Sequence, residues 1–291
     1  MNTKKIGLLS GPLAFILVLL FFQPEGLNPE AKGILASTIW IAIWWITEAI
    51  PISVTALLPI IIFPLTGGLD LIQTTASFGH KYVFLYVGGF IIAIAIQKWN
   101  LHKRIALNII RIIGTNVVKI ILGFMIATAF MSMWISNTAT AVMMLPIAMA
   151  IVAQLKDNPN TIEDENEIFG KALMLGIAYS ASIGGVSTLI GTPPNLVLAG
   201  VVEETFGYEI TFSEWFKFGF PISIILLFIC WKYITGIAFK FKQKDFPGGR
   251  QEINNQLKKI GKISYEEKLI AIVFSLTAFA WVTRDYLLKI L

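Results

Sequence analysis

Charged residues are scarce in this chain, and that scarcity excludes most soluble folds. Lys, Arg, Asp and Glu make up 14% of the 291 residues, and hydrophobic residues make up 56%. Soluble domains typically contain about 25% charged residues. Several uncharged runs reach the roughly 20 residues that a membrane-spanning helix requires. The sequence therefore predicts an all-α, polytopic membrane protein with no room for a sizeable soluble domain.

Cysteine, histidine and the common catalytic motifs are also rare or missing. Cys230 is the only cysteine, so a disulfide within the chain is excluded. His80 and His102 stand too far apart in sequence to suggest a metal pair, and no HExxH, GxSxG or P-loop pattern occurs. We therefore do not expect an enzyme. No nucleic-acid partner is expected either, because the net charge of +5 is typical of basic cytoplasmic loops.

Apolar runs and their interruptions predict the helices. The run after Lys5 lacks a small-residue cleavage site, so the first helix is expected to remain uncleaved. The expected helical segments are 6–22, 33–50, 51–65, 82–97, an amphipathic interfacial helix in 98–117, a pair in 120–155, a broken segment in 168–203, and spans at 219–239 and 267–288. With the N-terminus in the cytoplasm, 17 of the 23 basic residues fall on the cytoplasmic side, five fall outside and Lys232 lies within a span. This bias predicts a multi-pass protein of the plasma (inner) membrane with a cytoplasmic N-terminus.

Small polar residues interrupt the stretch between Lys119 and Lys156, which contains no charged residue. The residues concerned are Ser132, Ser136, Asn137 and Thr138. Their neutral oxygen atoms suit a weakly bound sodium ion. The spacing of four between Ser132 and Ser136 predicts that both hydroxyls lie on one helix face. The alternative is that these residues only cap helices or link them by hydrogen bonds.

Glycines and prolines interrupt the next apolar segment, at 184–195. Pro193 and Pro194 remove two successive N–H donors, which leaves the carbonyl groups near Leu189 and Ile190 without helical partners. Non-helical backbone at bilayer depth survives only inside protein or around a wet cavity. Broken helices of this kind build the ion and solute sites of transporters. A simple proline kink is the alternative.

Two arrangements are open for 120–155: two full spans joined by an outside turn, or a re-entrant hairpin that enters and leaves on the cytoplasmic side. A turn in water usually carries charges, Gly or Pro, and the stretch Ile135–Ala139 has none of them. We therefore favour the re-entrant hairpin. Glu48, close to Trp45, is interpreted as a structural residue at a cytoplasmic helix end, with proton carriage as the alternative.

Three regions of the sequence resemble the divalent anion/sodium symporter family. They are Ile43–Pro51 with Thr55–Pro59, Ser132–Pro146 and Gly184–Asn195. The resemblance implies inverted repeats, each with a re-entrant hairpin and a broken helix. By this resemblance the first sodium site consists of Ser132, Ser136, Asn137 and Gly185. The substrate contacts it implies are Asn137, Thr138, Thr192 and Pro193.

The resemblance also implies a domain plan. It places an N-terminal helix in 1–32, a first inverted repeat in 33–240, a cytoplasmic loop in 241–266 and the first helix of an incomplete second repeat in 267–291. The first repeat is expected to contain a scaffold part (33–117), a transport part with the hairpin and broken helix (118–203) and a closing helix (219–240). Family members carry a second Ser-Asn-Thr hairpin, whereas this sequence contains that tripeptide once. We therefore expect an N-terminal fragment from a truncated or split gene.

The function implied is sodium-coupled symport of a di- or tricarboxylate such as succinate, malate, fumarate or citrate, by elevator-type movement. The sodium ion is the coupling ion. Expected partners are membrane lipid, a second copy in a homodimer and a separate C-terminal half. A non-transporting membrane fragment and a same-fold carrier of sulfate or another inorganic anion are the alternatives. Alone, the chain is expected to insert into the membrane without transporting.

Overall fold

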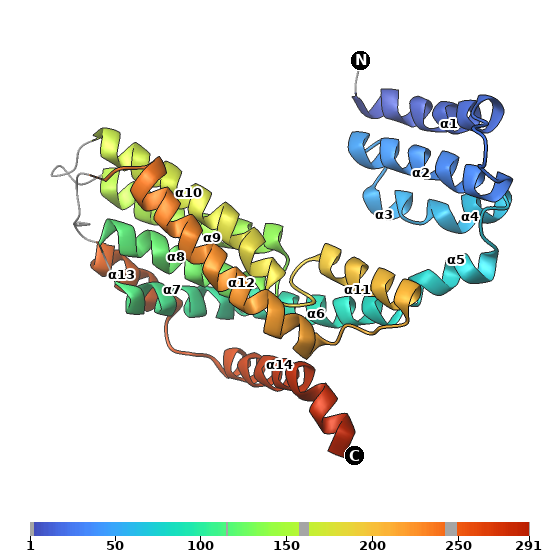
Figure 1. Cartoon of the computed structure of the whole chain (residues 1–291). Coiled ribbons are helices and arrows are strands. Elements are labelled where there is room, and N and C mark those ends of the chain that lie inside the picture. Colours follow the sequence, from blue (N-terminus) through green and yellow to red (C-terminus); the bar gives the residue numbers. More distant parts are fainter. Residues whose placement is uncertain (1–2, 115, 157–162, 242–248, 291) are drawn as a thin grey trace. The chain divides into compact units, whose positions relative to one another are not determined.

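The structure is a computed structural model that describes residues 3–114, 116–156, 163–241 and 249–290 (Figure 1). These residues form helices and connecting loops, with no strand among them. The chain divides into two compact units, Met1–Phe84 and Leu85–Leu291, which are described separately below. Residues 157–162 of the predicted transport part and 242–248 of the predicted cytoplasmic loop lie outside the described residues. The prediction of an all-α, polytopic fold is confirmed.

The first unit contains five helices. They are α1 (Thr3–Phe21), α2 (Pro29–Thr47), α3 (Ile52–Thr55), α4 (Leu58–Leu65) and α5 (Leu71–Phe78). Helix α2 packs against α1, α3 and α4. It begins where the Asn28 side chain accepts a hydrogen bond of 2.7 Å from the Ala31 N–H. It ends at Glu48, whose φ of 46° turns the chain out of the helix.

Two features of the first unit differ from the sequence prediction. The helix expected at 51–65 consists of the two short helices α3 and α4, with Pro59 in the first turn of α4. Helix α5 was not predicted, because its eight residues include polar side chains and resemble a loop. It begins at Asp70, whose carboxylate accepts a hydrogen bond of 2.7 Å from the Gln73 N–H. Local capping therefore produced a helix that apolar periodicity did not reveal.

Helix α6 (Lys81–Lys98) contains the boundary between the units, and the second unit continues with the remaining helices. These are α7 (Leu101–Ile113), α8 (Val117–Ser132), α9 (Asn137–Lys156), α10 (Glu163–Val186), α11 (Pro193–Phe206), α12 (Phe212–Lys232), a π-helical turn (Tyr233–Ala238), α13 (Gly249–Ile260) and α14 (Tyr265–Ile290). Helices α7, α9 and α10 all pack against α8, which forms the centre of this unit.

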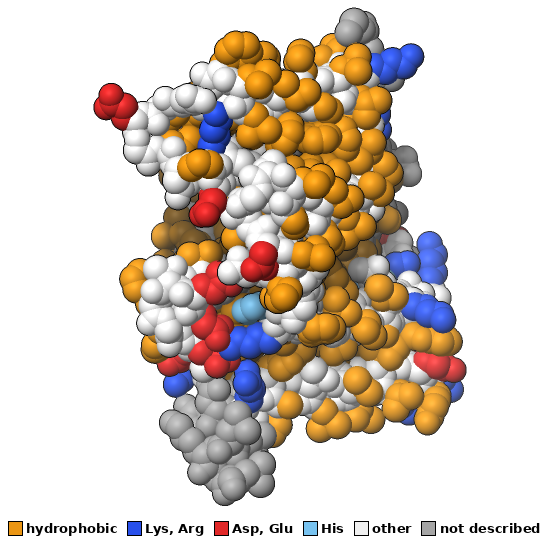
Figure 2. All heavy atoms as spheres, turned by 90° about the vertical axis from the view of Figure 1, so that its right-hand side faces the viewer, with side chains coloured by type: hydrophobic (Ala, Val, Ile, Leu, Met, Phe, Trp, Pro, Cys, Tyr) orange, Lys and Arg blue, Asp and Glu red, His pale blue; other side chains and the backbone are white. Residues whose placement is uncertain are grey.

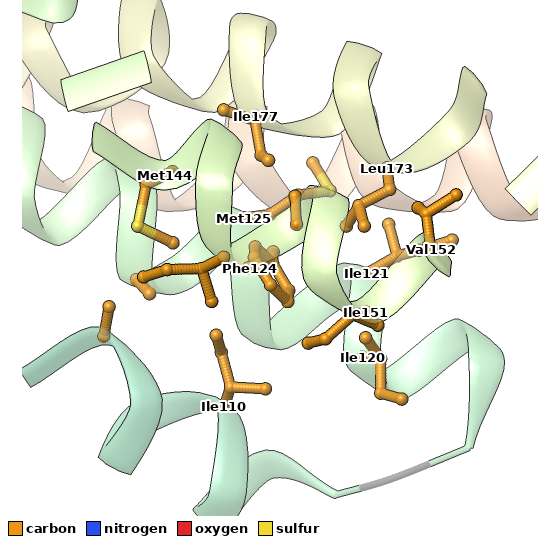
Figure 3. Close-up of a cluster of buried hydrophobic side chains, with 14 of the residues drawn as sticks. Ile110, Ile120, Ile121, Phe124, Met125, Met144, Ile151, Val152, Leu173 and Ile177 are labelled. Atoms are coloured by element: carbon orange, nitrogen blue, oxygen red, sulfur yellow. The ribbon is translucent and has the colours of Figure 1, made fainter. Parts of the chain in front are cut away.

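Apolar side chains from α7, α8, α9 and α10 form the core of the second unit (Figure 3). Phe124, Met125 and Ile121 on α8 are completely buried among them. Fully burying a side chain of this size stabilises a fold by about 1.5–3 kcal/mol when the reference state is water. This packing holds the end of α8 against α10, and both polar interruptions of the sequence lie at those helix ends.

The compact units divide at 84/85, whereas the sequence prediction divides the scaffold and transport parts at 117/118. Helix α7, assigned to the scaffold part, shares the core with α8 through Leu107 and Ile110. The predicted cytoplasmic loop 241–266 contains α13. That helix forms because Ile253 is completely buried in the same core. The division into scaffold and transport parts stays a prediction.

Four helices of the described chain are long and apolar enough to cross a membrane. They are Thr3–Phe21, Leu71–Lys98, Asn166–Val186 and Phe212–Ala238. The apolar helices Ile52–Leu65, Val117–Ser132 and Asn137–Ala153 are shorter. At 1.5 Å per residue, the 16 residues of α8 extend about 24 Å, less than a hydrocarbon core of about 30 Å. This length favours the re-entrant hairpin over a full span. Hydrophobic side chains also dominate the face shown in Figure 2, as a lipid-facing surface requires.

Ion pairs between described residues that are distant in sequence join residues predicted on the same side of the membrane. Lys4 and Glu48, both predicted cytoplasmic, lie 3.7 Å apart within the first unit. In the second unit the pairs are Arg104–Glu267 at 3.0 Å, predicted cytoplasmic, and Arg284–Glu209 at 3.6 Å, predicted external. The helix arrangement inside each unit is therefore consistent with the predicted topology.

Candidate ion and substrate site

The two polar interruptions lie against each other in the second unit. Helix α8 ends at Ser132 and α9 begins at Asn137, and we call the residues between these helices the first break. Helix α10 ends at Val186 and α11 begins at Pro193, and we call the residues between them the second break. The hydroxyl of Thr188 in the second break donates a hydrogen bond to the carbonyl of Met133 in the first. Two separate sequence motifs thus form one site.

Three oxygen atoms crowd together at the first break. The Ser132 hydroxyl lies 2.7 Å from the side-chain oxygen of Asn137 and 2.6 Å from the backbone carbonyl of Ala181 on α10. A serine hydroxyl has one proton, so it donates to only one of these two acceptors at a time. Ser132 is completely buried and Asn137 is half-buried, so water reaches this cluster only in part. This excess of oxygen over protons favours a cation.

Two glycines on α10 allow the first break to approach this closely. A Cβ atom at Gly185 would lie 2.3 Å from the Asn137 side-chain oxygen. A Cβ atom at Gly184 would lie 2.2 Å from the carbonyl oxygen of Ala129 on α8. Both distances are shorter than van der Waals contact, so neither position accepts a larger residue without movement. Gly185 therefore lies against the Asn137 side chain, and its role in a sodium site stays a prediction.

Ser136 lies beside the cluster and has a different role in the structure. Its hydroxyl accepts a hydrogen bond of 3.3 Å from the Ala139 N–H and thereby caps α9. The expectation that Ser132 and Ser136 lie on one helix face is wrong, because α8 ends at Ser132 and no helix joins the two residues. Of the four predicted sodium ligands, the structure brings Ser132, Asn137 and Gly185 into contact and places Ser136 next to Asn137 in the chain.

Buried aromatic and apolar residues hold the first break in place. Ile135 in the break and Met131 near the end of α8 pack in a buried cluster with Ile96 and Leu101. The ring of Trp134 meets the Phe274 ring of α14 edge-on, with centroids 5.1 Å apart. The break is therefore a packed loop with a defined shape, and its polar atoms are positioned before any ligand binds.

The second break is held by the side chain of Asn195. Its amide nitrogen donates to the carbonyl of Gly185 at 2.9 Å and to the carbonyl of Thr188 at 2.8 Å. The carbonyls of Leu189 and Ile190 accept no hydrogen bond from the described residues, as the two prolines require. The residues around them are buried, so these carbonyls are oxygen ligands without a partner.

The three other predicted substrate residues lie at the starts of two helices. Thr138 is in the first turn of α9, Thr192 precedes α11, and Pro193 is its first residue. Thr138 and Pro193 are exposed and Thr192 is half-buried, in contrast to the buried Ser132 cluster. Helix N-termini carry partial positive charge and favour anions. The site therefore combines a buried, oxygen-rich part with an open part that has the opposite electrostatic preference.

Sequence reasoning missed three contributors to this site. Ala181 supplies only a backbone carbonyl, so its side chain carries no signal. Thr188 and Asn195 lie inside the recognised motif, but their hydrogen-bond partners lie elsewhere in the chain or around a turn. A buried amide directly after two prolines is the one clue that the sequence offered for Asn195.

Glu48 and His102 are two ionisable residues outside the two breaks. Glu48 is exposed and pairs with Lys4 in the first unit, which favours its interpretation as a structural residue over proton carriage. His102 is buried on α7, and this burial lowers its pKa. In the described part of the chain, no group of three His, Cys, Asp or Glu side chains is arranged to hold a metal ion. The oxygen cluster at the two breaks consists of uncharged groups alone.

Comparison with known proteins connects this geometry to a family. Residues 3–290 match the family model described as the sodium:sulfate symporter transmembrane region. The chain is 48% identical over 286 residues to the sodium-dependent dicarboxylate transporter SdcS of Staphylococcus saprophyticus, covering 98% of this chain and 55% of that protein. SdcS of Staphylococcus aureus strain USA300 matches with the same identity and coverage. The chain therefore spans about half the length of these relatives. It is a multi-pass membrane protein that belongs to the sodium:sulfate symporter family.

Proposed function

We propose that this chain takes part in sodium-coupled symport of a di- or tricarboxylate, with succinate, malate, fumarate and citrate as the candidate substrates. The observation that carries this proposal is the cluster of three oxygens around the single Ser132 hydroxyl proton. The names of its relatives, sodium-dependent dicarboxylate transporters, agree with it.

Sodium is the transported cation in this proposal, and Ser132, Ser136, Asn137 and Gly185 form its first site. Hard, neutral oxygens offset part of the cost of removing water from the ion. Because none of them carries a formal charge, binding stays weak enough for release. The unpartnered carbonyls of Leu189 and Ile190 lie in the second break and add two further oxygen ligands to the region.

The substrate part of the site consists of Asn137, Thr138, Thr192 and Pro193. One carboxylate lies at the N-termini of α9 and α11, where the helix dipoles favour negative charge. Asn137 belongs to both parts, since its side-chain oxygen contacts Ser132 while its amide group lies at the start of α9. An occupied ion site fixes this side chain, and the substrate then binds to an ordered contact. This sharing couples the two ligands.

The wider mechanism in this proposal follows the family plan. The protein works as a homodimer in the plasma membrane with a cytoplasmic N-terminus, by elevator-type movement of the part that contains the two breaks. A carrier of sulfate is the second candidate, because the matching family model is described by sodium and sulfate. Both candidates use the same ion site, and they differ in the anion at the starts of α9 and α11.

A sodium-binding measurement on the purified chain tests this site directly. We expect sodium chloride to raise the apparent melting temperature relative to choline chloride, by about 3 °C or more at ten times the dissociation constant. Asn137→Ala and Gly185→Ala should abolish this shift, and Ser10→Ala on α1 should retain it. An equal shift in wild type and Asn137→Ala would contradict the ion site.

Anion choice needs a second measurement under the same conditions. In the presence of sodium, succinate should raise the melting temperature further and sulfate should not. The reverse order would favour the sulfate carrier. In proteoliposomes, the chain together with the remaining C-terminal part of a relative should take up labelled succinate in response to an inward sodium gradient. Uptake that is unchanged in choline would contradict symport.

A further inference from the structure

A cavity of about 400 Å³ lies in the second unit, away from the two breaks. It is formed by the start of α7, the end of α13 and the residues before α14. Lys103, Lys259 and Lys262 line it, and we refer to this cavity as the lysine pocket. Trp99 and Glu267 also contribute to its wall.

The only acidic residue that lines the lysine pocket is already paired. The Glu267 carboxylate accepts two hydrogen bonds of 3.0 Å from the Arg104 guanidinium and one of 2.8 Å from the Ser264 N–H. A third Arg104 N–H, on Nη1, donates to the Gly261 carbonyl at 3.0 Å. The Arg104–Glu267 pair therefore has no net charge and few free hydrogen-bonding positions.

The three lysines, in contrast, are left without counter-charges. Their ammonium groups form no ion pair or hydrogen bond with any residue that the structure describes. Three like charges around one cavity repel one another, and an anion inside it removes that repulsion. Lysine ammonium groups bind phosphate as point charges.

The lysine pocket lies where lipid headgroups are expected. Helix α7 has 13 residues, too few to span a bilayer, and its neighbour Trp99 is 39% exposed. Tryptophan concentrates at the level of the headgroups. The lysines also belong to the side predicted to be cytoplasmic, where anionic lipids attract basic segments.

We propose that the lysine pocket binds the phosphate group of an anionic phospholipid from the cytoplasmic leaflet. The three ammonium groups surround the phosphate, and Trp99 lies beside the glycerol region. Binding joins α7, α13 and the start of α14, the same elements that the Arg104–Glu267 pair connects. The proposal rests on the membrane location of the chain and on the predicted cytoplasmic side of these lysines, and it does not depend on the transport reaction.

Lysine acetylation in nanodiscs tests the proposal with the whole chain. Discs of phosphatidylcholine are compared with discs that also contain phosphatidylglycerol, and modified lysines are identified by mass spectrometry. We expect phosphatidylglycerol to slow acetylation of Lys259 and Lys262 several-fold and to leave Lys258 unchanged. Lys258 is the matched control because it lies on the same helix, is exposed and does not line the pocket. Equal protection of Lys258 would reveal only a diffuse surface potential and overturn the proposal.

Two further arms separate the source of the phosphate. Inorganic phosphate added to phosphatidylcholine discs should give no protection at millimolar concentration. Protection as strong as that from phosphatidylglycerol would overturn the lipid assignment, and so would protection by succinate. A phospholipid bound specifically in the lysine pocket is expected to remain bound after the protein is purified in detergent.

Variants test the same pocket through the lipid retained by the protein. Each Lys→Gln change at 103, 259 or 262 should lower retained phosphatidylglycerol by about fivefold, as counted by native mass spectrometry. Lys→Arg at these positions keeps the positive charge and should retain most of the lipid. That result would show that the lipid lost from the Lys→Gln variants reflects the lost charge and not unfolding. Lys258→Gln should have no effect. Retention unchanged in Lys259→Gln/Lys262→Gln would overturn the proposal.

Discussion

The first and second breaks both expose oxygen atoms inside the second unit, but they differ in which atoms they offer and in what holds their shape. The first break is short and offers side-chain oxygens, from Ser132 and Asn137, that are held by neighbouring apolar packing. The second break is longer and offers backbone carbonyls, because two prolines remove the N–H donors that would bond them. Its shape is held by one side chain, Asn195. Packing thus supports the first break and hydrogen bonds support the second, so the two should respond differently to mutation.

The largest effect is expected where the two breaks are pressed together. Gly184→Ala places a Cβ atom 2.2 Å from the Ala129 carbonyl oxygen, and backbone cannot yield as a side chain can. Overpacking usually costs about 1–3 kcal/mol. Because the contact here is with rigid backbone, we expect a loss of stability of about 3 kcal/mol or more. Urea or thermal unfolding in detergent measures it.

Gly170→Ala on the same helix is the matched control. Its new Cβ atom would meet Val152 at 3.5 Å, an ordinary contact. It should be neutral or stabilise α10, because alanine favours a helix by about 1 kcal/mol relative to glycine. Equal losses of stability in Gly184→Ala and Gly170→Ala would show that the close approach of α8 and α10 is not needed to hold the two breaks together.

A smaller but selective effect is expected for Asn195→Ala. The carbonyls of Gly185 and Thr188 lose this donor. Thr188 keeps the Gly191 N–H at 3.3 Å, so the Gly185 carbonyl is the buried group left unsatisfied, which costs about 1–3 kcal/mol. We expect the second break to loosen while the first keeps its packing, so hydrogen exchange should rise in 187–192 and stay low in 133–136. Asn108→Ala, whose amide bonds the Arg104 carbonyl at an exposed position, is the control. Equal exchange in both breaks would remove the distinction between them.

The smallest effect should come from the single hydrogen bond between the breaks. Thr188→Val removes the donor to the Met133 carbonyl while keeping the shape of the side chain. We expect a loss of about 1 kcal/mol, the usual contribution of one such bond together with its unsatisfied acceptor. Thr188→Ser retains the hydroxyl and should restore most of the stability. If Thr188→Ser is as unstable as Thr188→Val, the methyl group and not the hydrogen bond is responsible.

The sequence predicted the positions of the long helices more accurately than the structure of the segments between them. The expected spans at 6–22 and 82–97 agree with α1 and α6 to within a few residues, because an uninterrupted apolar run is a strong and local signal. The capped helix α5 was missed, since its formation depends on Asp70 and not on periodicity. The one-face argument for Ser132 and Ser136 failed because it assumed a continuous helix where packing of Trp134 and Ile135 supports a loop.

By itself, the sequence determined the class of this protein, its helical spans and the two polar breaks, because hydropathy and backbone breakers act over neighbouring residues. The membrane orientation stays a prediction from the sequence. Its motifs also sufficed to identify the family. Only the tertiary structure decided that the Ala181 carbonyl meets Ser132, that Asn195 holds the second break and that three lysines surround one cavity. These contacts join residues far apart in the chain or depend on backbone atoms that every residue shares. No local pattern encodes them, and the packing of α7, α8 and α10 creates them.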